Sequence, residues 1–115
     1  MRSDRELLEL AARAALGRTS IPDQHVQMIE RGWNPLDNDS EPFRLAVRMR
    51  MHILIGTSEV TVTVRDGAGK ECMAQERFRA VDGGEYEATR RAIVRAAAEI
   101  GAQAHPDNKD EGANG

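Results

Sequence analysis

The sequence has few cysteines and aromatic residues, and it has no long hydrophobic run. Its single cysteine, Cys72, excludes an internal disulfide, and no group of Cys and His has the spacing of a zinc site. One Trp, one Tyr and two Phe leave the aliphatic residues to form the core. No apolar stretch approaches the ~20 residues of a membrane-spanning helix, and the charged N-terminus is unlike a signal peptide. We therefore expect a small soluble domain in the cytoplasm, with no membrane association.

The charges nearly balance. The chain has 16 Lys and Arg against 19 Asp and Glu, a net charge of −3. A protein that binds nucleic acid by neutralising phosphates needs a basic surface, so this balance argues against nucleic acid as a partner. Residues 105–115 are polar and rich in Gly, Asn and Asp, and we expect them to be a disordered tail. Residues 1–104 are then long enough for a single domain.

The first helix is predicted over residues 3–16. Ser3 and Glu6 have the spacing of a capping box, and apolar residues follow at helical spacing. Residues 17–40 are predicted to form a loop, with a short helix near 23–31 that begins after a proline.

Two further helices are predicted, over residues 41–50 and 85–101, and Gly101 is expected to end the second of them. For the first, the residues expected to share the broad apolar face are Phe43, Ala46, Val47 and Arg50, flanked by Leu45 and Met49. For the second, the residues expected on the apolar stripe are Tyr86, Thr89, Ile93, Ala97 and Ile100.

Residues 51–80 are predicted to form three strands. The compact apolar run over 51–55 is typical of a strand that is covered on one or both faces. Residues 60–65 alternate Val with polar residues, which is the pattern of a half-buried strand. Residues 70–80 have several charges that suit an edge strand, with Cys72 on its inner face.

This order of elements predicts an α+β fold. Short connections favour a three-stranded antiparallel meander, packed with an N-terminal helix, a central helix and a long C-terminal helix. Helices would then cover one face of the sheet. The other face, which carries Thr61 and Thr63, or a strand edge would remain available, so self-association as a homodimer stays open.

No residue pattern indicates catalysis. His25, His52 and His105 are scattered, and we expect His52 to be half-buried in its strand and the other two to be solvated. Cys72 is expected to be a small core residue and not a nucleophile. The acidic residues over 37–41 lack the spacing of a calcium loop, so turn and capping roles are favoured. We therefore predict no enzymatic activity, no cofactor and no metal.

Two longer stretches resemble a known family. They read Trp-Asn-Pro-Leu over residues 33–36, with an acidic turn and Phe-Arg-Leu-Ala-Val over 43–47 after it, and the helical sequence over 88–101. Over residues 5–16 and 33–101, most of the folded chain, the sequence is similar to the phage ABA sandwich domain family of small phage and prophage proteins. It departs from that family over 18–32, where aromatic residues are missing. The resemblance implies a phage or prophage accessory protein in a bacterial host cell, and the family has no established chemistry to carry over.

Two contact surfaces follow from this interpretation. The favoured function is non-enzymatic binding to a host or phage protein, with Trp33 and Leu36 as candidate anchors, although a lone Trp could instead pack on the core. The alternative is a nucleic-acid-associated role, because the helix–strand–strand–strand–helix order also occurs in the double-stranded RNA-binding domain. The candidate basic patch for that alternative consists of Arg48, Arg50, Arg91 and Arg95.

Overall fold

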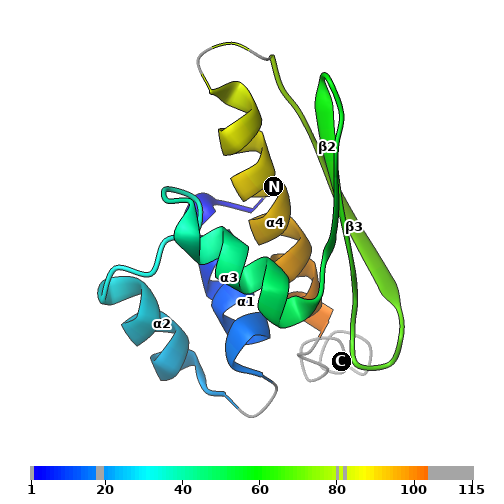
Figure 1. The fold of residues 1–115 in the computed structure, drawn as a ribbon. Coiled ribbons are helices and arrows are strands. Elements are labelled where there is room, and N and C mark those ends of the chain that lie inside the picture. Colours follow the sequence, from blue (N-terminus) through cyan, green and yellow to red (C-terminus); the bar gives the residue numbers. More distant parts are fainter. Residues whose placement is uncertain (1, 18–19, 80, 82, 104–115) are drawn as a thin grey trace.

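The structure is a computed structural model that describes residues 2–17, 20–79, 81 and 83–103 (Figure 1). The predicted tail and His105 therefore lie outside the described residues. The elements in chain order are α1 (Asp4–Leu16), α2 (Pro22–Glu30), α3 (Ser40–Met49), β1 (His52–Ile55), β2 (Glu59–Arg65), β3 (Glu71–Arg77) and α4 (Gly84–Gln103). This order confirms the predicted α+β class, and α2 confirms the short helix. In the described part of the chain, no helix is both long enough and apolar enough to cross a membrane.

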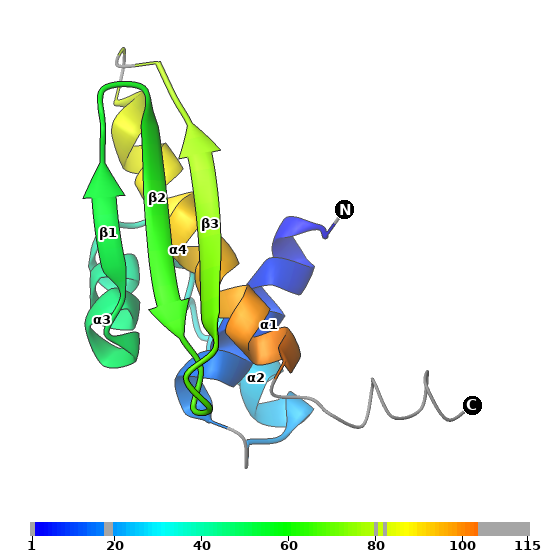
Figure 2. The same ribbon diagram turned by 90° about the vertical axis from the view of Figure 1, so that its right-hand side faces the viewer.

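The three strands form an antiparallel sheet in the order β1-β2-β3, as the short connections predict (Figure 2). Val62 in the middle strand faces Ile53 on β1 and Ala74 on β3. Because partners in an antiparallel pair point to the same face, these residues share the helix-facing side of the sheet. Thr61 and Thr63 point to the opposite side, which no helix of the described residues covers (Figure 2).

The core lies between the sheet and α4. Val60, Val62 and Val64 are almost fully buried, and they face a helix whose inner side is rich in alanine. Helix α1 packs on the far side of α4 and runs in the same direction, because Asp4 contacts Arg91 and Arg13 contacts the Gly101 backbone. The layers are therefore the sheet, then α4, then α1, with α2 outermost (Figure 1).

Gly101 does not end the last helix as predicted. Helix α4 continues to Gln103, and Gly101 is buried inside it. A Cβ atom built at Gly101 would lie 2.0 Å from the carbonyl oxygen of Leu10. The glycine is therefore placed where α1 and α4 approach too closely for any side chain.

Several positions that were predicted to be buried are exposed. Phe43 and Val47 are exposed, because α3 turns Pro42, Leu45 and Ala46 inward instead. Strand β1 is exposed at every position, since α4 covers β2 and β3 but not the β1 edge. Tyr86 is also exposed, because burial along α4 begins only at Ala88.

The two histidines in the described residues also differ from expectation. His52 is exposed and not half-buried, because it points to the uncovered side of the sheet. His25 is buried and not solvated, because α2 packs against α1. Its Nε2 atom lies 2.7 Å from Oγ of Ser20, and that hydroxyl also donates to the Gly17 carbonyl.

Candidate functional site

The predicted anchors Trp33 and Leu36 lie in the loop between α2 and α3. Both are partly buried and pack against the core, so the structure places them as packing residues. Arg90 of α4 holds this loop in place. Its Nε donates to the Leu36 carbonyl at 3.0 Å, and its Nη1 pairs with Asp39 at 2.8 Å. Nothing in the local sequence signals this contact, since Arg90 lies far from the loop in the chain.

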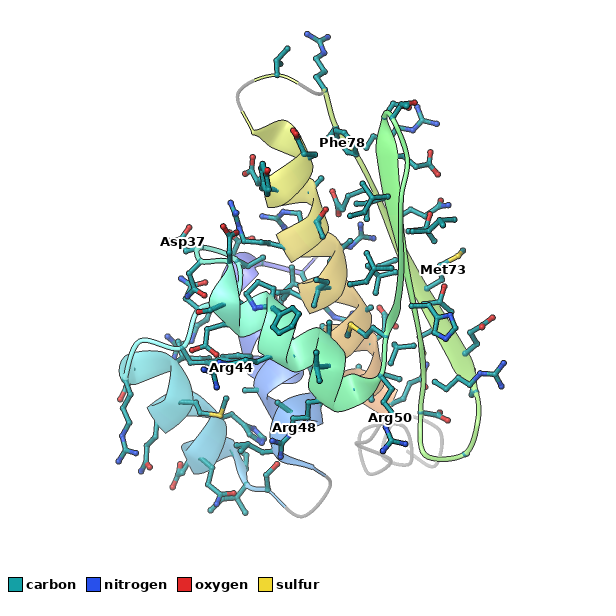
Figure 3. All side chains as sticks on the ribbon, in the orientation of Figure 1. Asp37, Arg44, Arg48, Arg50, Met73 and Phe78 are labelled. Atoms are coloured by element: carbon teal, nitrogen blue, oxygen red, sulfur yellow. The ribbon has the colours of Figure 1, made fainter. Side chains whose placement is uncertain are left out.

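The structure does not bring the four predicted arginines into one patch. Arg91 pairs with Asp4 at 3.0 Å, and Arg95 pairs with Glu76 on β3. Arg48 lies instead on α3, on the side of α2, and Arg50 follows the end of α3 just before β1 (Figure 3). Because Arg91 and Arg95 already face carboxylates, they offer little free positive charge to a phosphate backbone.

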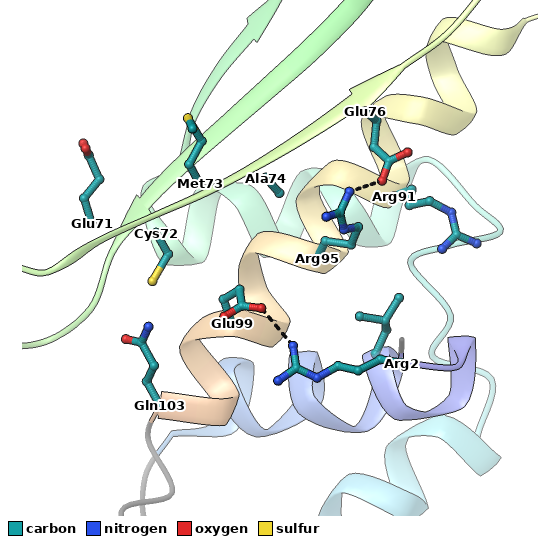
Figure 4. A pocket seen from close by; sticks show the side chains of 11 residues that line it. Arg2, Glu71, Cys72, Met73, Ala74, Glu76, Arg91, Arg95, Glu99 and Gln103 are labelled. Atoms are coloured by element: carbon teal, nitrogen blue, oxygen red, sulfur yellow. Dashed lines mark hydrogen bonds and ion pairs between the residues drawn. The ribbon is translucent and has the colours of Figure 1, made fainter. Parts of the chain in front are cut away.

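A cleft of about 570 Å³ lies between α4, β3 and the start of α1 (Figure 4). Charged side chains of both signs line it, and they pair with each other: Arg2 contacts Glu99 at 2.8 Å, and Arg95 contacts Glu76. Each of these pairs has at least one member that is substantially exposed to water, which screens the attraction. The cleft therefore presents a solvated, internally neutralised charge network.

Cys72 forms part of the wall of this cleft (Figure 4). It is buried on the helix-facing side of β3, as predicted. Burial raises the pKa of the Cys72 thiol, so the thiol keeps its proton at neutral pH. Since the thiolate is the reactive form, this environment does not activate the sulfur as a nucleophile. Across the described ranges, no three His, Cys, Asp or Glu side chains are grouped so that they could hold a metal ion.

Large exposed apolar side chains gather instead at α3 and β1. We call this set the β1–α3 surface, and its members with their exposed fractions are Phe43 (68%), Val47 (62%), Ile53 (37%), Leu54 (75%) and Ile55 (58%). Helix α3 leads almost directly into β1 and lies behind it in Figure 2. Leu54 points to the uncovered face of the sheet, and Ile53 and Ile55 point to its helix-facing side. Clustered exposed apolar side chains are typical of contact surfaces.

The spacing along α3 explains how this surface forms. Phe43 and Val47 are four residues apart and therefore lie on one flank of the helix. Arg44 and Arg48 lie on the opposite flank, on the side of α2 (Figure 3). Leu45 turns inward, and Phe43 and Val47 are left exposed to solvent.

The backbone of β1 is available along its outer edge. The Gly56 amide donates to the Glu59 carbonyl at 2.8 Å, which fixes the hydrogen-bonding phase of the hairpin. In that phase Leu54 bonds to β2, whereas the amides and carbonyls of Ile53 and Ile55 point outward. No strand of the described residues pairs with this edge.

The opposite edge of the sheet, on β3, is protected. Arg95 donates to the outward carbonyl of Gln75 at 2.9 Å, and the strand carries exposed charges at Glu71 and Arg77. Charges on an edge strand discourage pairing with another strand. Residues 51–57 contain no Lys, Arg, Asp, Glu or Pro, so β1 has none of these protections. The two edges therefore differ in their capacity to accept a further strand.

The sequence predicts the charged edge at residues 70–80 but not the exposed edge at β1. The missing charges over 51–57 were a visible signal, yet an unbroken apolar run is also what a covered strand would have. The chain matches no protein-family model, and comparison with curated proteins and with solved structures also gives no match.

Proposed function

We propose that the protein is a non-enzymatic protein-binding module whose contact surface is the β1–α3 surface. One observation carries this proposal: α3, which exposes Phe43 and Val47, leads directly into β1, and the outer edge of β1 is unprotected. A free strand edge offers backbone hydrogen bonds to an added strand, and neighbouring apolar side chains supply affinity and selectivity.

The size of the surface is sufficient for a stable contact. The exposed fractions of its side chains together equal about three whole side chains, and burying each contributes about 1.5–3 kcal/mol. The total of roughly 5–9 kcal/mol is comparable to the entropic cost of bringing two proteins together. Backbone hydrogen bonds at the edge would then add to the net affinity.

The resemblance to the phage ABA sandwich domain family supports a more specific role. It favours an accessory protein of a phage or prophage that acts by contact in the cytoplasm of a bacterial host. The paired arginines on α4 give no comparable support to a nucleic-acid-associated role.

Photo-crosslinking tests the proposed surface. Phe43 is replaced by p-benzoylphenylalanine, which is close to phenylalanine in shape, in the organism that encodes the protein. Tyr86 is an exposed aromatic residue at the far end of α4, and it gives a matched control position. We expect a crosslinked product from the Phe43 position and none from Tyr86. Equal crosslinking at both positions, or none at Phe43, would refute the proposal.

A further inference from the structure

We propose that the occupant of the β1–α3 surface is a second copy of this chain. The two β1 strands would pair antiparallel across a twofold axis and join the two sheets into one. This inference rests on the proposed function, because it identifies the protein that the surface binds.

The backbone allows one well-matched register. A twofold axis perpendicular to the sheet brings together residues that point to the same face. Ile53, Leu54 or Ile55 then faces its own copy; with Ile55 at the axis, Ile53 would face Thr57, which lies beyond the end of β1. With Ile53 at the axis, Ile55 would face Met51, whose amide already donates to the Ala46 carbonyl at 3.0 Å. With Leu54 at the axis, Ile53 faces the second copy's Ile55, and all their outward amides and carbonyls can bond.

The side chains complement each other in that register. On the outer face, Leu54 meets the second copy's Leu54. On the helix-facing side, Ile53 and Ile55 of both chains form a continuous apolar row. This row is partly exposed in the single chain because α4 does not reach it, and α3, which exposes Phe43 and Val47, leads directly into β1. Pairing would therefore bury the apolar groups that the fold leaves uncovered.

The absence of charge along β1 allows a second copy to pair there without like-charge repulsion. In a twofold pairing, residues near the axis meet their own kind, so any charge there would be repelled. Residues 51–57 are uncharged, and the one titratable side chain, His52, would face Gly56 and not its own copy. The β3 edge, with Glu71 and Arg77, has no such neutral stretch.

The exposed apolar area of the β1–α3 surface is also of the size that a dimer interface needs. A standard interface takes about 800 Å² from each partner, roughly a tenth of a small protein's surface. The accessible surface here is 7530 Å². The exposed parts of the β1–α3 side chains amount to roughly 500 Å², if a large side chain buries about 160 Å². The strand backbone and the groups around it would supply the remainder.

Placing a positive charge at Leu54 in one variant and a negative charge there in another tests the register. Leu54 is the most exposed member of the surface, so the Leu54→Lys and Leu54→Glu variants should fold normally, as checked by circular dichroism and melting temperature. Sedimentation equilibrium should show a dimer for the natural chain. For each variant the dissociation constant of the dimer should rise about tenfold or more, because like charges meet at the axis. An equimolar mixture of the two variants should recover the dimer, since opposite charges then meet.

Met73→Lys is the matched control. Met73 is exposed on the same outer face, but it lies on β3 at the other edge, so this variant should remain dimeric. A natural chain that stays monomeric at about 0.5 mM, well above the dissociation constant of an ordinary specific interface, would overturn the inference. So would a dimer that Leu54→Lys leaves unchanged, or a mixture that fails to recover.

The crosslinking experiment separates the two proposals. A Phe43 product that contains two copies of this chain supports both. If the product contains a different protein, and the chain is monomeric in solution, the second-copy inference fails while the binding function stands. If Phe43 gives no product at all, both fail.

Discussion

Replacing Gly101 with alanine tests the close contact between α1 and α4. The added Cβ would lie 2.0 Å from the Leu10 carbonyl oxygen and 2.8 Å from its carbonyl carbon. Both atoms belong to the backbone, so no side-chain rotation can relieve the clash. The two helices would have to move apart by about 1.4 Å or more to restore an ordinary contact distance.

Two opposing effects set the size of the change. Alanine favours a helix over glycine by about 1 kcal/mol, which would stabilise α4. Overpacking a tight contact costs about 1–3 kcal/mol, and a backbone clash belongs at the upper end of that range. We therefore expect Gly101→Ala to lower the free energy of unfolding by about 2 kcal/mol, or the melting temperature by roughly 8 °C.

Urea unfolding followed by circular dichroism measures this change. Gly67→Ala is the control, because no atom lies within 4 Å of a Cβ at Gly67, and its φ is outside the left-handed region. That substitution should be neutral or stabilising by about 0.5 kcal/mol. A Gly101→Ala protein as stable as the natural one would show that α1 does not approach α4 at this point.

Three other predictions follow from single side chains. Trp33→Ala should lower the free energy of unfolding by about 2 kcal/mol in urea, because Trp33 packs on the core; an unchanged value would restore its role as a binding anchor. Burial raises the pKa of the Cys72 thiol, so its contribution to stability is present below the unfolded pKa of about 8.5 and is lost as pH rises through the folded value. Between about pH 7 and pH 10, Cys72→Ala should therefore lose less stability than the natural chain in parallel unfolding curves. Hydrogen bonds from Ser3 lower the pKa of Glu6, so the stability from Glu6 is present above its unfolded pKa and is lost as pH falls; an NMR titration should show a higher Glu6 pKa in Ser3→Ala.

Signals that act over a few residues predicted their elements correctly. Ser3 and Glu6 form the capping box at the start of α1. The Glu6 amide donates to Oγ of Ser3 at 3.1 Å, and the Ser3 amide donates to Oε1 of Glu6 at 2.8 Å. The alternating valines of β2 point to the core as their period requires. In each case the deciding interactions lie within one turn of helix or between alternate residues of a strand.

The candidate site could not be predicted in the same way. Helix α3 has apolar residues on more than one side, so its sequence fits either an inward Phe43 and Val47 or an inward Leu45 and Ala46. The position of α4 selects the second arrangement. The apolar run of β1 likewise fits a covered strand or an edge strand. It is an edge strand because, in this sheet, it pairs with β2 and with no other strand.

The sequence by itself determined the order of elements, the α+β class, the meander and the start of α1, because these depend on hydrogen bonds and side-chain periods between near neighbours. The tertiary structure alone decided which apolar residues stay exposed, which strand edge is free and why Gly101 carries no side chain. Those properties depend on α1, α4 and the sheet, which are distant in the chain and meet only when it folds.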